Sequence, residues 1–219
     1  TTMYWDVYGS RINMNEPIWV NYHKHTSLSN RYMKDSPLLP IDYWNELKAR
    51  YGNKSCIYTT VEHGWAGNYF KQYDDLEKFN KKNGTNIRWI YGAEAYWVKD
   101  RHESDRSNCH IVLLARTDKG RKAINKILSI ANKDGYYARP RIDLELINQL
   151  PIDDVMITTA CIAFWNKYDD IDDIVRHIAE SFPHFYLEVQ AHDTPEQKEL
   201  NWRIIQISEE LNVPIIAGC

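Results

Sequence analysis

Hydrophobic and polar positions follow two different periods along this chain, and the two periods alternate. Short runs rich in β-branched and aromatic residues predict strands, whereas apolar residues spaced three or four positions apart predict helices. The predicted strands cover residues 18–22, 56–61, 87–90, 95–98, 110–115, 155–159, 185–189 and 213–217. The predicted helices cover residues 40–51, 69–83, 119–132 and 170–181, and another begins after Thr194.

Local signals mark the ends of two of these helices. Gly52 follows the first helix, where a glycine commonly caps a C-terminus. The buried face of that helix is predicted to consist of Ile41, Trp44, Leu47 and Tyr51. Thr194 precedes the last helix as a typical N-cap, and Pro195 suits the first turn.

The alternation of strands and helices predicts an α/β fold with a parallel sheet covered by helices. The strands 87–90 and 95–98 are expected to flank Gly92. Six or seven strand–helix units in 219 residues favour a closed or nearly closed barrel over an open sheet.

Composition narrows the class of protein and of partner. Hydrophobic residues make up 43% of the chain, aromatic residues 13%, and the formal net charge is −3, which excludes a disordered chain. This small charge argues against a module that coats nucleic acid with basic surface, although one local nucleic-acid site stays open. The longest apolar run, 160–165, is far short of the ~20 residues that span a membrane, and no signal peptide is visible. The four cysteines have no CxxC spacing, so we expect reduced thiols and a cytoplasmic protein.

Residues able to bind metal gather at successive strand ends, where the loops of a β/α barrel converge on one mouth. These residues are His23, His25, Glu62, His63, Glu94 and Cys161, together with His110, which opens its strand. Imidazole, carboxylate and thiolate groups suit zinc, manganese or iron, and two such ions can activate a water molecule and hold a phosphate. Each residue alone has an ordinary structural explanation, such as a buried free cysteine. Their joint occurrence favours a metal site.

The segments that carry these residues resemble known motifs. His23-Lys24-His25-Thr26, Glu62-His63-Gly64, the Gly92–Tyr96 stretch and the His110–Ala115 stretch resemble the successive motifs of the PHP (polymerase and histidinol phosphatase) superfamily. The segments 137–143, 185–192 and 195–197 are similar to the N-terminal PHP domain of bacterial and phage C-family DNA polymerases, the polymerase III alpha subunits. The resemblance covers residues 18–219 and leaves 1–17 as an N-terminal extension.

The resemblance implies a distorted (β/α)7 barrel, possibly incomplete at its C-terminal end, that holds up to three divalent metals: zinc, manganese or iron. The implied ligands are His23, His25, Asp35, Glu62, His63, Glu94, His110 and Cys161. Glu62, His63 and Glu94 would be catalytic, with Glu94 as the bridging acid. Two departures stand out, because Val61-Glu62-His63 replaces the usual Thr-Asp-His and the last Asp-x-His motif would fall after Cys219.

In active members such a cluster supports phosphoester hydrolysis, proposed to be 3′–5′ proofreading of single-stranded DNA ends. The expected partners are therefore DNA and the remainder of a polymerase alpha subunit, and no membrane. Two alternatives stay open: a catalytically inactive scaffold of the polymerase, and a free-standing phosphatase of the histidinol phosphate type. The residues expected to contact DNA are Lys119, Arg121, Lys122, Arg139 and Arg141, with a solvated helix face as the ordinary explanation.

Overall fold

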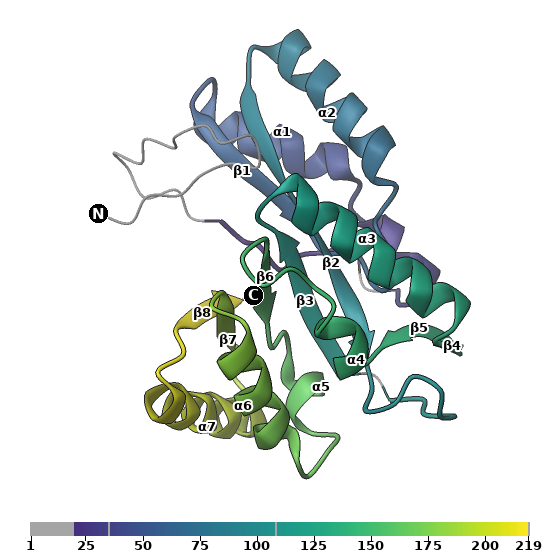
Figure 1. Cartoon of the computed structure of the whole chain (residues 1–219). Coiled ribbons are helices and arrows are strands. Elements are labelled where there is room, and N and C mark those ends of the chain that lie inside the picture. The colour runs from purple at the N-terminus through teal and green to yellow at the C-terminus, as the bar shows by residue number, and fades with distance from the viewer. Residues whose placement is uncertain (1–19, 35, 108, 219) are drawn as a thin grey trace.

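The computed structural model describes residues 20–34, 36–107 and 109–218 (Figure 1). Its strands are β1 (Ser55–Thr60), β2 (Asn86–Trp97), β3 (Cys109–Ala115), β4 (Tyr136–Tyr137), β5 (Arg139–Ile142), β6 (Val155–Thr158), β7 (Phe185–Gln190) and β8 (Ile215–Gly218). Its helices are the 3-10 helix η1 (Ser27–Arg31), α1 (Pro40–Tyr51), α2 (Tyr69–Asn83), α3 (Asp118–Lys133), α4 (Leu144–Ile147), α5 (Ile162–Trp165), α6 (Ile171–Ser181) and α7 (Pro195–Leu211).

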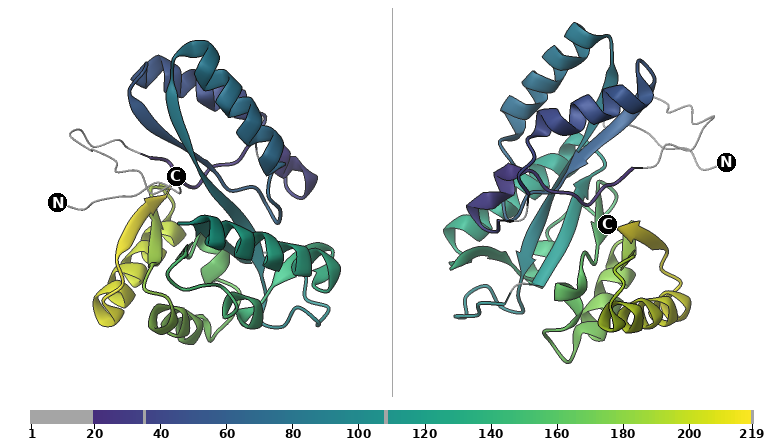
Figure 2. Two further views of the ribbon diagram at one scale, coloured as in Figure 1. Left: turned by 45° about the horizontal axis from the view of Figure 1, so that its top comes forward. Right: turned by 180° about the vertical axis from the view of Figure 1, so that it is seen from behind.

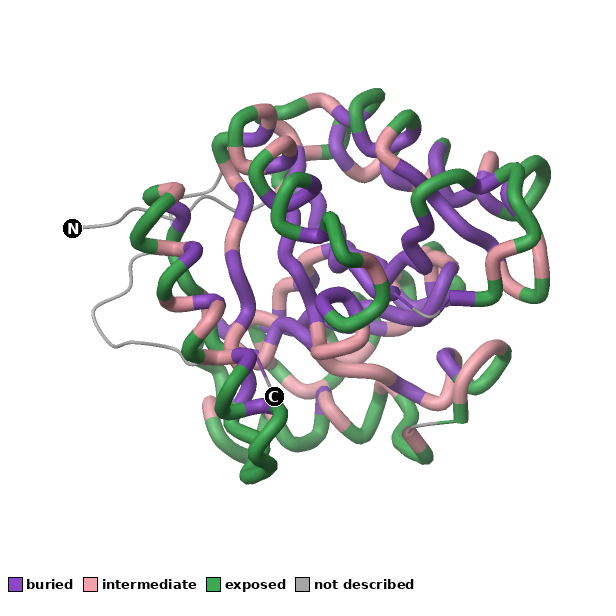
Figure 3. Tube along the Cα trace, turned by 90° about the horizontal axis from the view of Figure 1, so that it is seen from below, coloured by how far each residue is buried: buried purple, intermediate pink, exposed green. Residues whose placement is uncertain are grey.

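The strands form one curled sheet with helices on its outer side, as two further views show (Figure 2). The strand order is β4-β5-β2-β3-β6-β7-β8, and β1 pairs with the first half of β2. Within the described residues the path of paired strands stays open, so the predicted barrel is present as a partial barrel. Seen from below, the buried residues concentrate on the strands and the inner helix faces, while the outer helix surfaces are exposed (Figure 3).

The sheet is mixed, which corrects the prediction of an all-parallel one. Strand β3 runs antiparallel to both of its neighbours, β2 and β6. Its first residues therefore lie beside the last residues of β2, with His110 opposite Tyr96. His110 reaches the end of the sheet where the parallel strands finish, although it begins its own strand.

Two expectations about strands are also corrected. The strands predicted on either side of Gly92 are one continuous strand, β2, because Gly92 pairs with Leu114 of β3 without interrupting the ladder. Of the predicted first strand, residues 18 and 19 lie outside the described residues. Residues 20–22 belong to no strand and lead directly to His23.

The helices follow the sequence pattern closely. Helices α1 and α2 have the predicted bounds, and the Thr194 hydroxyl accepts a hydrogen bond from the Gln197 N–H at the start of α7. Trp44 of α1 is buried in a cluster between α1, α2, β1 and β2. Ile41, however, is 45% exposed, because the predicted apolar face is wider than the surface that this cluster covers. Within the described part of the chain, every helix is too short or too polar to cross a membrane.

Candidate metal centre

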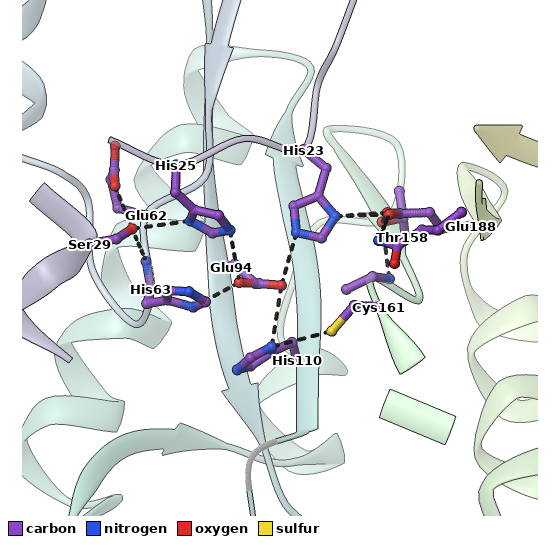
Figure 4. Close-up of polar contacts among 12 residues, drawn as sticks. His23, His25, Ser29, Glu62, His63, Glu94, His110, Thr158, Cys161 and Glu188 are labelled. Atoms are coloured by element: carbon purple, nitrogen blue, oxygen red, sulfur yellow. Dashed lines mark hydrogen bonds and ion pairs between the residues drawn. The ribbon is translucent and has the colours of Figure 1, made fainter. Parts of the chain in front are cut away.

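The side chain of Glu94 lies at the centre of a ring of four histidines (Figure 4). Its Oε1 is 3.0 Å from Nε2 of His23 and 3.5 Å from Nδ1 of His110. Its Oε2 is 2.7 Å from Nδ1 of His63 and 3.3 Å from Nε2 of His25. Each carboxylate oxygen therefore faces two imidazoles.

Four segments bring these side chains together. His23 and His25 come from the segment before η1, His63 from the residues after β1, Glu94 from β2 and His110 from β3. The backbone fixes two of them, because the N–H of Glu94 donates to the carbonyl of Glu62 and His63 forms a bridge with Glu94. The rings of His25 and His63 stack with centroids 4.2 Å apart. The structure brings these five predicted residues together at one place.

The five residues form two groups that share Glu94. One group is His23, His25 and Glu94, and the other is His63, Glu94 and His110. In each group one atom from every residue lies within 4.8 Å of the others. A carboxylate common to two histidine pairs has the arrangement expected of a bridge between two ions.

Burial and charge set the protonation of this centre. Burial by itself raises the pKa of Glu94, but the charges of His23 and His110 hold that pKa well below its usual range. For His23, burial lowers the pKa, but Glu94 and Glu188 outweigh it and raise the pKa to about 10. Burial lowers the pKa of His110. The carboxylate of Glu94 is thus kept ionised.

Glu188 of β7 is a member of the site that the sequence analysis did not identify. It is 1% exposed, and its Oε1 lies 2.9 Å from Nδ1 of His23. It also accepts hydrogen bonds from Gln190 and from the hydroxyl of Tyr22. By holding Nδ1, Glu188 directs Nε2 of His23 toward Glu94, as carboxylates behind metal-binding histidines do. The available signal was a carboxylate and an amide, at positions 188 and 190, on one face of an otherwise apolar strand.

The backbone of β8 approaches Glu188 closely at Gly218. A Cβ atom at this position would lie 1.9 Å from Oε1 of Glu188. Any side chain at position 218 would therefore displace the carboxylate that orients His23.

Glu62 lies beside the ring but faces away from it. Its oxygens accept hydrogen bonds from the hydroxyl of Thr26 at 2.7 Å, the N–H of Thr26 at 3.2 Å and the hydroxyl of Ser29 at 2.5 Å. Burial raises the pKa of Glu62, opposite to the direction for Glu94. Ser29 in turn contacts Nδ1 of His25 at 3.1 Å and accepts the N–H of His63 at 3.2 Å. In this arrangement Glu62 organises the segment that presents two histidines.

The remaining predicted ligands lie at the edge of the centre or outside the described residues. Sγ of Cys161 is 3.5 Å from Nδ1 of His110, and burial raises the pKa of this thiol to about 12. Asp35 lies outside the described residues. Cys56, Cys109 and Cys161 are free thiols in the described part of the chain.

The predicted DNA-contacting residues lie in two different places. Lys119, Arg121 and Lys122 are on α3, where Asp154 and Asp118 pair with them. Arg141 is buried and donates to the carbonyls of Gly135, Arg101, Glu103 and Asp105. The guanidinium of Arg139 lies over the ring of Tyr96, 5.0 Å from its centroid. Of these five residues, the structure places only Arg139 next to the metal centre.

Comparison with known families agrees with this geometry. Residues 21–192 match the model of the PHP domain family, which covers most of the chain and all the described members of the ring. The chain belongs to this family. The membership predicted from the four motifs is thereby confirmed.

The relatives of this PHP domain include subunits of DNA polymerase III. The chain is 30% identical to DNA polymerase III subunit alpha of Aquifex aeolicus, over 91% of the chain and 18% of that relative. It is 30% identical to the same subunit of Borreliella burgdorferi, over 78% of the chain and 15% of the relative. A PolC-type DNA polymerase III of Clostridium perfringens is 28% identical over 50% of the chain. The chain spans less than a fifth of the length of these relatives.

The residues of this PHP domain fit divalent metals. Nε2 of His110 is buried and has no hydrogen-bond partner among the described residues, which is costly unless another group binds it. The donors are mainly imidazole nitrogens around one carboxylate, a set that zinc, manganese and iron accept and that calcium and magnesium do not favour.

Proposed function

We propose that this PHP domain binds divalent metal ions, which Glu94 and the four surrounding histidines would hold, and hydrolyses phosphoester bonds. The main support is that the four histidines form two pairs around one buried carboxylate, Glu94. His23 and His25 would hold one ion, and His63 and His110 the other. Cys161, next to His110, is placed to join the second group.

Bound ions of this kind supply a hydroxide at neutral pH and neutralise the charge of a phosphate. The chain's own residues would position the ions and the groups that hold them. Glu94 stays ionised between the two groups, and Glu188 fixes the ring of His23. Glu62 acts through Ser29 on His25 and His63, so we assign it a positioning role.

The substrate we propose is a DNA strand end, and the partner is the remainder of a polymerase III alpha subunit. Support comes from the relatives, which are DNA polymerase III subunits over most of this chain. A 3′–5′ exonuclease beside a polymerase would remove misincorporated nucleotides, so the reaction proposed is proofreading. The expected ions are zinc, manganese or iron, because imidazole donors dominate the site.

The test is elemental analysis of the dialysed 219-residue chain, followed by two hydrolysis assays. We expect two or more ions per chain and metal-dependent cleavage of bis(p-nitrophenyl) phosphate. Release of nucleotides from the 3′ end of a labelled single strand would then identify DNA as substrate. A chain that retains metal but cleaves neither compound would contradict the proposed hydrolysis.

One observation favours a second candidate, a catalytically inactive scaffold. Glu62 occupies the usual aspartate position, yet its carboxylate is engaged by Thr26 and Ser29. In that case the metals, or the ring of histidines alone, would stabilise the domain for its polymerase. Manganese-dependent cleavage that disappears in His63→Ala would exclude the scaffold, and the same assay with histidinol phosphate would detect a free-standing phosphatase.

A further inference from the structure

Three of the described arginines differ from the others in their partners, and one of the three, Arg139, lies beside the metal centre. Five described arginines bind carboxylates, in the pairs Arg50–Glu46, Arg101–Asp143, Arg121–Asp118, Arg176–Glu210 and Arg203–Asp172. Arg31, Arg106 and Arg139 have no hydrogen bond or ion pair with another described residue; each lies over an aromatic ring instead. Their charge is therefore uncompensated within the described part of the chain.

These three arginines and their rings are connected to one another by short contacts. Arg31 lies 5.3 Å from the ring centroid of Tyr32 and 5.7 Å from that of Trp65. Arg106 lies 5.5 Å from the ring centroid of Tyr137, which pairs with Arg139 across the β4–β5 turn. We call Arg31, Tyr32, Trp65, Arg106, Tyr137 and Arg139 the arginine–aromatic strip.

Tyr96 joins this strip to the metal centre. Its ring lies edge-on to Tyr32 at 6.3 Å and beneath Arg139 at 5.0 Å. On its other side it stacks with His63 at 5.8 Å and meets His110 at 5.2 Å. The rear view shows η1 next to the β4–β5 hairpin, the two segments that carry most of the strip (Figure 2).

We infer that the arginine–aromatic strip binds single-stranded nucleic acid and leads one of its phosphates, held by Arg139, to the metal centre. This inference rests on the proposed function for the fate of that phosphate. Unpaired arginines complement a phosphate backbone, and partly exposed aromatic rings offer stacking surfaces for bases. Tyr32, Trp65 and Tyr137 are each partly exposed.

A single strand, rather than a duplex, fits this surface because the aromatic rings can stack only with unpaired bases. Bases in a duplex are stacked on each other and offer their faces to no protein ring, whereas unpaired bases do. A protein partner would instead require an apolar patch, and this surface carries three arginines that form no ion pair with another described residue. The basic face of α3 is a weaker candidate, because Asp118 and Asp154 already neutralise Lys119, Arg121 and Lys122.

The experiment measures fluorescence anisotropy of a labelled 12-nucleotide DNA strand with the 219-residue chain in EDTA, so that no cleavage interferes. We expect the double variant Arg31→Gln/Arg139→Gln to bind at least about tenfold more weakly. The slope of log affinity against log salt should become shallower by about 1.4, which corresponds to two phosphate contacts on a single strand. Tyr32→Leu should weaken binding while leaving that slope unchanged, because it removes a stacking surface and no charge.

Two control variants have the same change in net charge. Arg50→Gln/Arg176→Gln removes arginines that are paired with glutamates, and Lys119→Gln/Lys122→Gln tests the α3 face. Both should bind within about twofold of wild type. Equal losses in the strip variant and either control, or equal affinity of wild type for a duplex probe, would overturn the inference.

Binding and cleavage assays together test the strip independently of the proposed hydrolysis. Wild type that fails to bind the strand but cleaves bis(p-nitrophenyl) phosphate would disprove the strip and leave the hydrolytic centre standing. Wild type that binds the strand through the strip without cleaving any phosphoester would support the strip and disprove the hydrolysis. Circular dichroism of each variant checks that a loss of binding is not a loss of fold.

Discussion

Glu62 and Glu94 are neighbours with the same side chain and opposite surroundings. The backbone N–H of Glu94 donates to the carbonyl of Glu62 at 3.1 Å, and both carboxyl groups are buried. Imidazoles surround Glu94, whereas two hydroxyls and one backbone N–H surround Glu62. The pKa of Glu94 lies well below its usual range and that of Glu62 lies above it.

This difference indicates that the neighbours of a buried carboxylate, more than its position at a strand end, decide its role. The charges of His23 and His110 keep Glu94 ionised, in line with the metal-binding role proposed for it. Neutral donors make Glu62 a structural acceptor that orders the chain from Thr26 to Ser29. Substitutions at the two positions should therefore separate metal affinity from stability.

The largest effect is expected at Glu94. Glu94→Gln removes the charge shared by the two histidine groups while keeping the size of the side chain. We expect metal affinity to fall by more than the ~10–100-fold typical of residues behind the ligands, with loss of any phosphoesterase activity. Elemental analysis after dialysis and isothermal titration with Mn²⁺ or Zn²⁺ measure this. Unchanged metal content in Glu94→Gln would remove Glu94 from the centre.

The next effect is expected at Glu62. Glu62→Ala leaves the buried donors of Thr26 and Ser29 without their acceptor, which should lower the free energy of unfolding by about 2–4 kcal/mol. Denaturant unfolding of the metal-free chain measures this loss.

Glu62→Gln is the matched variant for Glu94→Gln. We expect it to retain the bound metals, with a smaller loss of stability than Glu62→Ala, because it still accepts one of the hydrogen bonds. Loss of metal as severe as in Glu94→Gln would instead make Glu62 a ligand, as the family resemblance implies.

The contrast also explains how much of this molecule could be predicted from its sequence. Periodicity and caps gave α1 and α2 their bounds, because these signals lie within the helices themselves. The ring of His23, His25, His63 and Glu94 was predictable from the joint occurrence of ligand residues in the matched motifs, although His23 and His25 follow no strand and Glu94 lies within β2. The direction of β3 was not, since it depends on pairing with β2 and β6.

The orientation of side chains could not be predicted from the sequence either. Whether Glu62 turns toward metal or toward Thr26 depends on the path of residues 26–29, which no local pattern specifies. Glu188 escaped notice because hydrophobic neighbours dominate its strand, and its purpose emerges only when β7 is placed beside His23. Contacts of this kind join residues that are 165 positions apart.

The smallest effect, a pH dependence, tests whether Glu94 and Glu188 act together on His23. The pKa of His23 is raised from 6.5 to about 10, so the folded chain binds this proton more tightly than the unfolded chain. The stability from this pairing is fully present below pH 6.5 and is lost as pH rises toward 10. Between pH 7 and 8 the loss in the metal-free chain is at most about 1.4 kcal/mol, the slope for one proton. His23→Gln should flatten this dependence in thermal unfolding with EDTA, whereas His102→Gln, at an exposed loop position, should not. Identical pH profiles for wild type and His23→Gln would mean that the two glutamates do not hold a proton on His23.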